Sequence, residues 1–85
     1  MITIFGSTDC YSCIKSKQLL EIAQFEHEMI YVENDPERFR STFPGEGKIP
    51  QIIWEGEHIG GYLELAEKVN ETLENELKQR GESDD

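Results

Sequence analysis

The chain has 85 residues, the size of one small domain, so we expect a single domain rather than several. Hydrophobic residues make up 36% of the sequence and charged residues 31%, as in a folded globular protein rather than a disordered segment. The net charge of −10 repels phosphate backbones and anionic membranes, so we expect neither nucleic-acid nor membrane binding.

The acidic charge is concentrated in residues 55–85, which hold ten acidic and three basic side chains. We interpret it as a solvated face that favours solubility, with docking to a basic partner as the alternative. No segment fits a secretory signal or a membrane span of roughly 20 apolar residues. We therefore expect a cytoplasmic protein, in which a cysteine pair is more often catalytic or metal-binding than structural.

The first half of the chain predicts a strand, a helix and a second strand. Residues 2–5 alternate apolar and polar side chains, which is typical of a short strand. From Cys10 the spacing becomes helical. The apolar residues at that spacing, expected on the inner face, are Ile14, Leu19, Ile22 and Ala23. Residues 29–32 form a β-branched and aromatic run, so the helix predicts a parallel crossover between two strands.

The second half predicts a short helix, a hairpin and a long helix. Asn34-Asp35-Pro36-Glu37 is a helix start, and Phe39 and Phe43 would anchor that helix to the sheet. Strands at 51–54 and 58–59 flank a tight turn in which glycine takes positive φ. A helix over 62–80 follows, and residues 82–85 are expected to form a flexible acidic tail. The expected inner face of this helix is Leu65, Ala66, Val69, Leu73 and Leu77.

Cys10 and Cys13 lie three positions apart at the start of the first predicted helix, close enough to form a disulfide. The positive end of the helix dipole stabilises a thiolate at Cys10, so we expect Cys10 to be the nucleophile and Cys13 the resolving thiol. Cys10 would attack a substrate disulfide, and Cys13 would then attack Cys10 to release the reduced substrate. Lys15 and Lys17 add positive charge nearby, or simply form the exposed face of the helix.

Two structural roles for the pair are weaker interpretations. A scaffold disulfide across so short a loop gains little stability, and the cytoplasm keeps thiols reduced. A zinc site needs two more ligands, and His27 and His58 lack the close spacing of a zinc finger. We therefore expect redox chemistry and no metal.

Three motifs together resemble the glutaredoxin family, and small phage and bacterial members are the most similar. They are Cys10-Tyr11-Ser12-Cys13, then Ile49-Pro50-Gln51-Ile52, which is similar to the family's TVPQI, and Gly60-Gly61-Tyr62. The resemblance covers almost the whole chain and implies one glutaredoxin domain over residues 1–81. It implies an α/β thioredoxin fold of order β-α-β-α-β-β-α, with a four-stranded mixed sheet and helices on both faces.

The resemblance also implies a glutathione site. Its residues would be Tyr11, Lys48, Ile49, Pro50, Gly61, Tyr62 and Leu63. Pro50 would be cis and face the cysteines, and the backbone of Ile49 would pair with the cysteine of glutathione. From the residues alone, Pro50 marks the start of a strand. The γ-glutamyl carboxylate would bind at the start of the last helix, since helix N-termini bind anions. Tyr11 and Tyr62 would form walls of the groove or only pack.

The sequence departs from the family pattern at three places. Tyr11-Ser12 stands between the cysteines where proline and tyrosine are usual, which leaves the reduction potential open. Ser7-Thr8-Asp9 replaces the lysine that commonly precedes the motif and binds the glycyl carboxylate, a role that Lys48 would take. Leu63 replaces the acid or hydroxyl that many members place at the γ-glutamyl group.

The function that the resemblance implies is reduction of protein or glutathione mixed disulfides by a monomeric, glutathione-dependent dithiol oxidoreductase. Similarity to phage members suggests ribonucleotide reductase as one partner. The nearest alternative is a thioredoxin-like redoxin reduced by thioredoxin reductase. From a different class, some glutaredoxins carry a glutathione-ligated 2Fe–2S cluster between two subunits, although a second cysteine favours disulfide chemistry.

Overall fold

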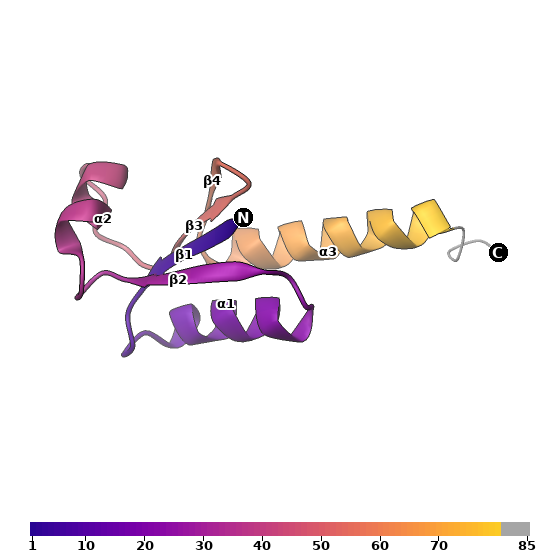
Figure 1. The fold of residues 1–85 in the computed structure, drawn as a ribbon, viewed down its shortest axis with the longest axis horizontal. Helices are drawn as coiled ribbons and strands as arrows, with labels where there is room; N and C mark the ends of the chain where they lie inside the picture. The colour runs from indigo at the N-terminus through magenta and orange to yellow at the C-terminus, as the bar shows by residue number, and fades with distance from the viewer. Residues whose placement is uncertain (81–85) are drawn as a thin grey trace.

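The computed structural model describes the fold of residues 1–80 and the side chains of residues 1–77. The elements follow the predicted order (Figure 1). They are β1 (Ile2–Gly6), α1 (Tyr11–Ile22), β2 (His27–Tyr31), α2 (Pro36–Thr42), β3 (Gln51–Trp54), β4 (Glu57–Gly60) and α3 (Tyr62–Arg80). The expected domain end at residue 81 and the expected tail over 82–85 lie outside the described residues.

The four strands form one mixed sheet in the order β2-β1-β3-β4. β1 pairs in parallel with β2, so α1 is the crossover that the sequence predicts, and β1 pairs antiparallel with β3. The β3–β4 hairpin closes through Glu55 and Gly56, whose φ angles are 50° and 85°. Positive φ at both central residues matches the twist of a two-residue hairpin turn, which explains the glycine. The predicted hairpin is confirmed.

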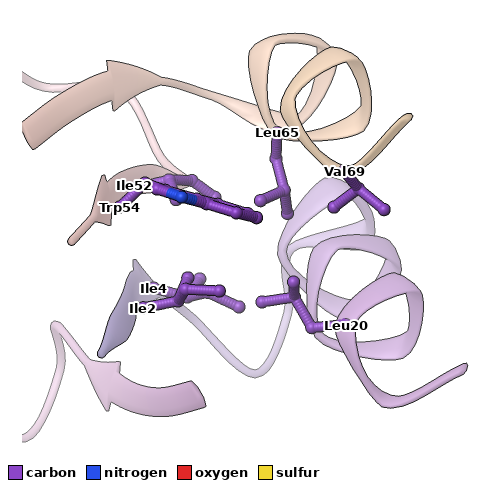
Figure 2. Close-up of a cluster of buried hydrophobic side chains, with 7 residues drawn as sticks. All are labelled: Ile2, Ile4, Leu20, Ile52, Trp54, Leu65 and Val69. Atoms are coloured by element: carbon purple, nitrogen blue, oxygen red, sulfur yellow. The ribbon is translucent and has the colours of Figure 1, made fainter. Parts of the chain in front are cut away.

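One face of the sheet packs against α1 and α3 (Figure 2). Ile2 and Ile4 of β1 and Ile52 and Trp54 of β3 alternate along their strands, so their side chains leave the sheet on the same side. They meet Leu20, Leu65 and Val69 from the two helices. This cluster fixes the last turn of α1, through Leu20, and the first two turns of α3, through Leu65 and Val69, relative to the sheet.

The opposite face packs against α2. Phe5, the residue of β1 that alternates with Ile4, meets Phe39 and Phe43, with ring centroids 6.2 and 5.1 Å away. Asp35 caps α2 by accepting a hydrogen bond from the Arg38 N–H at 3.3 Å, and proline opens the helix. The predicted helix start and phenylalanine anchors are both confirmed, and helices cover both faces.

The predicted inner face of α1 is partly wrong. Ile14 and Ile22 are 42% and 81% exposed, whereas Cys13, Ser16 and Leu20 are fully buried. Leu19 and Ala23 pack at the edge of the core as predicted. Ser16 tolerates burial because its hydroxyl donates a hydrogen bond to the Ser12 carbonyl at 2.8 Å. The predicted inner face therefore lies on a different side of α1 from the buried face, which contains Cys13 and Ser16.

The predicted inner face of α3 is correct for its first half only. Leu65 and Val69 are buried, but Leu73 and Leu77 are 37% and 43% exposed. The reason is geometric, because α3 continues past the end of the sheet and leaves its last turns without a surface to pack on (Figure 1). Within residues 1–80, no helix combines the length and apolar character that a membrane span requires.

Candidate functional site

Cys10 occupies the N-cap of α1. Its backbone is extended, with φ −102° and ψ 115°, and its carbonyl accepts the first helical hydrogen bond from Ile14 N–H at 3.0 Å. Its sulfur accepts a hydrogen bond from the Cys13 N–H at 3.2 Å, in the way that a serine or aspartate oxygen usually caps a helix. A backbone N–H and the positive end of the helix therefore both point at this sulfur.

Cys13 lies one turn further along α1 and is fully buried, whereas Cys10 is partly exposed. Burial, followed by the hydrogen bond with Cys10, raises the pKa of the Cys13 thiol from 9.0 to about 12. The two sulfurs therefore differ in their access to solvent. The outer one can meet a substrate, and the inner one stays protonated until it reacts.

The raised pKa of Cys13 predicts a pH dependence of stability. The unfolded thiol titrates near its ordinary 9.0 and the folded thiol near 12, so between these values the unfolded state loses a proton that the folded state keeps. The contribution of Cys13 is complete below pH 9 and is lost progressively as the pH rises toward 12. Urea unfolding from pH 7 to 11 should show a steeper loss of stability in the reduced protein than in Cys13→Ser. Equal slopes would contradict the assignment.

The loop before β3 faces Cys10. The Ile49–Pro50 peptide bond is cis, as the family resemblance implies, and the Cys10 sulfur lies 4.0 Å from the Ile49 carbonyl oxygen. The buried Gln51 side chain braces this loop by donating to the Lys48 carbonyl at 3.0 Å. The Gln51 amide oxygen in turn lies 2.7 Å from His58 Nε2 on β4. The loop is thus tied to both strands of the hairpin.

The N-terminus of α3 lies against the same loop. A Cβ atom on Gly61 would be 3.4 Å from the Pro50 carbonyl oxygen, a close approach that glycine permits. The Gly61 N–H donates to the Glu64 carboxylate at 2.9 Å, an arrangement that caps the helix start. This hydrogen bond lowers the pKa of Glu64, so the carboxylate is held ionised at the positive end of α3.

These three elements enclose an open groove of about 780 Å³, called here the Pro50 groove. Its lining residues are Ser12, Lys15, Glu46, Lys48, Ile49, Pro50, Gln51, His58, Gly60, Gly61, Tyr62, Leu63 and Glu64. Six of the seven predicted glutathione residues are in this list. The seventh, Tyr11, is 74% exposed and lies outside the lining. In residues 1–80, no group of three or more His, Cys, Asp and Glu side chains is placed to hold a metal ion.

A family model described as glutaredoxin matches residues 2–59, which include the cysteine pair and the Pro50 loop. The chain belongs to the glutaredoxin family. It is 31% identical to glutaredoxin 1 of Rickettsia conorii over 91% of this chain and 84% of that one. It is also 31% identical to glutaredoxin 1 of Rickettsia prowazekii, over 91% of this chain and 90% of that one. This glutaredoxin is accordingly a thiol-disulfide oxidoreductase with its two cysteines in CxxC spacing.

Solved structures agree with the family. Reduced glutaredoxin of Escherichia coli superimposes with a TM-score of 0.70 at 27% identity, over 86% of this chain and 96% of that one. NrdH-redoxin of Escherichia coli, described as glutaredoxin-like with a thioredoxin-like activity profile, gives 0.69 at 28% identity, over 82% and 91% of the two chains. The predicted thioredoxin fold is therefore confirmed.

Seven residues that line the Pro50 groove of this glutaredoxin were not predicted as site residues, among them Glu64, Lys15 and His58. Glu64 had a signal, because an acid at the third position of a helix suits a cap. Lys15 was visible only as nearby positive charge. His58 had no signal, because its contact with Gln51 exists only once the hairpin register is set.

Gly6, at the end of β1, gives a structural prediction for this site. A Cβ there would lie 2.7 Å from the Cys13 sulfur and 2.9 Å from its Cβ, so Gly6→Ala must displace the buried cysteine. We expect a loss of about 1–3 kcal/mol in the free energy of unfolding. Gly47→Ala is the control, since a Cβ there meets nothing within 4 Å, and should stay within about 0.5 kcal/mol. Urea unfolding measures both, and equal stability of the two variants would contradict the close contact.

Proposed function

We propose that this glutaredoxin reduces protein and glutathione mixed disulfides with glutathione as its reductant, using Cys10 as the nucleophile and Cys13 as the resolving thiol. The observation that carries the proposal is that the Cys10 sulfur lies 4.0 Å from the carbonyl of Ile49, a residue of the Pro50 groove. A substrate sulfur approaching Cys10 would therefore have the groove beside it. Lys48, Pro50 and the start of α3 are the groove parts that would hold glutathione.

The reaction consists of two thiolate displacements. The Cys10 thiolate attacks one sulfur of the substrate disulfide, the S–S bond breaks, and the other sulfur leaves as a thiolate. Cys13, protonated because of its raised pKa, gives its proton to a departing thiolate and attacks the Cys10 sulfur. The products are a Cys10–Cys13 disulfide, one substrate thiol and one substrate thiolate, which takes its proton from water, and two electrons are transferred to the substrate. Two molecules of glutathione then restore the dithiol and leave as glutathione disulfide.

The start of α3 would bind the γ-glutamyl carboxylate of glutathione, but one of its backbone N–H groups is already occupied. The Gly61 N–H already donates to Glu64, so the carboxylate would use the next backbone N–H groups, at Tyr62 and Leu63, which belong to the unpaired first turn of the helix. The Leu63 side chain is 72% exposed and offers no polar group. Binding at this end of the groove would therefore depend on the backbone.

A second candidate function is a thioredoxin-like redoxin that thioredoxin reductase recharges. Two observations favour it. Leu63 presents an exposed apolar side chain at the groove, and the acidic Asp9 directly precedes Cys10, where a glycyl carboxylate would be repelled. The similarity to NrdH-redoxin, with its thioredoxin-like activity profile, supports the same proposal.

The proposed chemistry indicates a compartment and a class of protein substrate. A dithiol that must be reduced in every cycle requires a compartment rich in reductant, so we propose the cytoplasm. Among protein substrates we propose ribonucleotide reductase, for which the support is the resemblance of the motifs to phage glutaredoxins. The partner surface would be the exposed side of the Pro50 groove.

The deciding experiment follows NADPH consumption by the oxidised protein with a small disulfide substrate. One reaction contains glutathione and glutathione reductase, and the other contains thioredoxin reductase alone. Turnover only with glutathione is the expected result. Turnover only with thioredoxin reductase would select the second candidate, and no turnover in either reaction would contradict both.

A further inference from the structure

Lys15 is held between two aromatic rings at the edge of the Pro50 groove. Its Nζ lies 4.4 Å from the ring centroid of Tyr62, the first residue of α3, and 5.3 Å from that of Tyr11, one turn earlier on α1. Both distances are within the range of cation–π attraction. Two rings from two helices therefore fix the position of a side chain that normally has many rotamers.

No described carboxylate, within residues 1–77, forms an ion pair with Lys15. Among the side chains that the structure describes, the ion pairs join the Met1 ammonium to Glu55 and Lys17 to Glu21. The two groove carboxylates already accept backbone hydrogen bonds, Glu46 from Lys48 N–H at 3.1 Å and Glu64 from Gly61 N–H at 2.9 Å. Lys15 thus presents a fixed, unpaired cation beside carboxylates that have other partners.

Lys48, the other lysine of the groove, is held differently. Its side chain is exposed, whereas Lys15 is partly buried. A fixed charge discriminates between ligands better than one on a free side chain, because less conformational entropy is lost on binding. A chain with a net charge of −10 repels anions on average, so a local cation decides whether an anionic substrate reaches the cysteine.

We propose that Lys15 is a specificity residue that selects disulfides carrying a carboxylate a few bonds from the sulfur. The inference rests on the proposed disulfide reduction and deepens it. It assigns the substrate class, anionic thiols in disulfide linkage, whichever reductase recharges the protein. The carboxylate would meet the Lys15 ammonium while the sulfur of the same molecule meets Cys10.

Three small disulfides of similar length and different charge test this assignment. Dithiodipropionate is dianionic, bis(2-hydroxyethyl) disulfide is neutral, and cystamine is dicationic. Each is mixed with the fully reduced protein, the reaction is quenched with an alkylating agent, and mass spectrometry counts the remaining thiols. Every turnover converts one probe disulfide into two thiols and the Cys10–Cys13 pair into a disulfide, so no other reductant enters the measurement.

Lys15→Gln removes the charge, Lys15→Arg keeps it, and Lys17→Gln removes a neighbouring charge from the same helix as the control. We expect Lys15→Gln to lower the rate with dithiodipropionate about fivefold to tenfold relative to the neutral probe. Cystamine should react faster with this variant. Lys15→Arg and Lys17→Gln should keep the wild-type ratio, and the anionic preference should weaken in high salt.

Three results would overturn the assignment. Equal slowing of all three probes by Lys15→Gln would mean that Lys15 acts on the cysteines rather than on the substrate. Unchanged ratios would mean that it does not act on charge at all. The same change in Lys17→Gln would mean a general effect of net charge. If wild-type protein reduces none of the three disulfides, the proposed function itself fails, which is a different outcome from these.

Discussion

Cys10→Ser should lose disulfide reduction almost completely, by more than about a thousandfold, in the assay with either reductase. The reason is chemical, because a serine hydroxyl at the N-cap of α1 still caps the helix but is not ionised at neutral pH. The fold should therefore persist. Circular dichroism and urea unfolding of the variant provide the control, and full turnover by a folded Cys10→Ser would show that the proposed mechanism is wrong.

The companion variant Cys13→Ser separates the two steps of the same mechanism. It should keep part of the activity on glutathione mixed disulfides, because a second glutathione can replace the resolving thiol. It should lose most activity on protein disulfides and accumulate a mixed disulfide at Cys10 that mass spectrometry detects. A variant that resolves protein disulfides at the wild-type rate would exclude Cys13 as the resolving thiol.

Leu65→Ala should produce a large loss of stability, about 3 kcal/mol within a range of 2–5 kcal/mol. Leu65 is fully buried and belongs to the cluster where α1 and α3 meet the sheet (Figure 2). Removing most of its side chain leaves a cavity that these elements cannot close without moving. The loss is large for a domain of 85 residues, whose total stability is of the order of 5–15 kcal/mol.

Leu77→Ala is the matched control on the same helix. Leu77 is 43% exposed, on the part of α3 that extends beyond the sheet, so its removal should cost less than about 1 kcal/mol. Urea unfolding of both variants gives the difference directly. Equal losses would mean that the far end of α3 packs against something in solution.

The order and type of every element follow from the sequence because each carries a local signal. Asp35 and Pro36 mark a helix start, and Gly56 marks the hairpin turn. The phase of α1 does not follow, because two of its three buried positions are Cys13 and Ser16. Cys13 is predicted from the sequence as a site residue and Ser16 is assigned to neither face, whereas the structure places Cys13 against Gly6 of β1 and satisfies the Ser16 hydroxyl with a hydrogen bond to the Ser12 carbonyl.

Parts of the candidate site could also be predicted from the sequence, and other parts could not. The cysteine pair and the Pro50 loop are recognisable because each is a contiguous motif. The contacts that join them depend on pairs far apart in the chain, such as Gln51 with His58 across the hairpin and Lys15 with Tyr62 between two helices. Spacing along one chain segment cannot predict such pairs, so His58 and the position of Lys15 between its two aromatic rings became apparent only in the structure.

The unequal burial of the two sulfurs also has a consequence for oxidative damage. A peroxide that reaches this surface meets the partly exposed Cys10, because Cys13 is fully buried. The sulfenic acid formed at Cys10 lies one helical turn from a thiol, with which it condenses to a disulfide and releases water. The same reductant that completes each catalytic cycle then removes that disulfide. The arrangement therefore turns an encounter that would lead a solitary cysteine toward irreversible sulfinic acid into an ordinary step of the redox cycle.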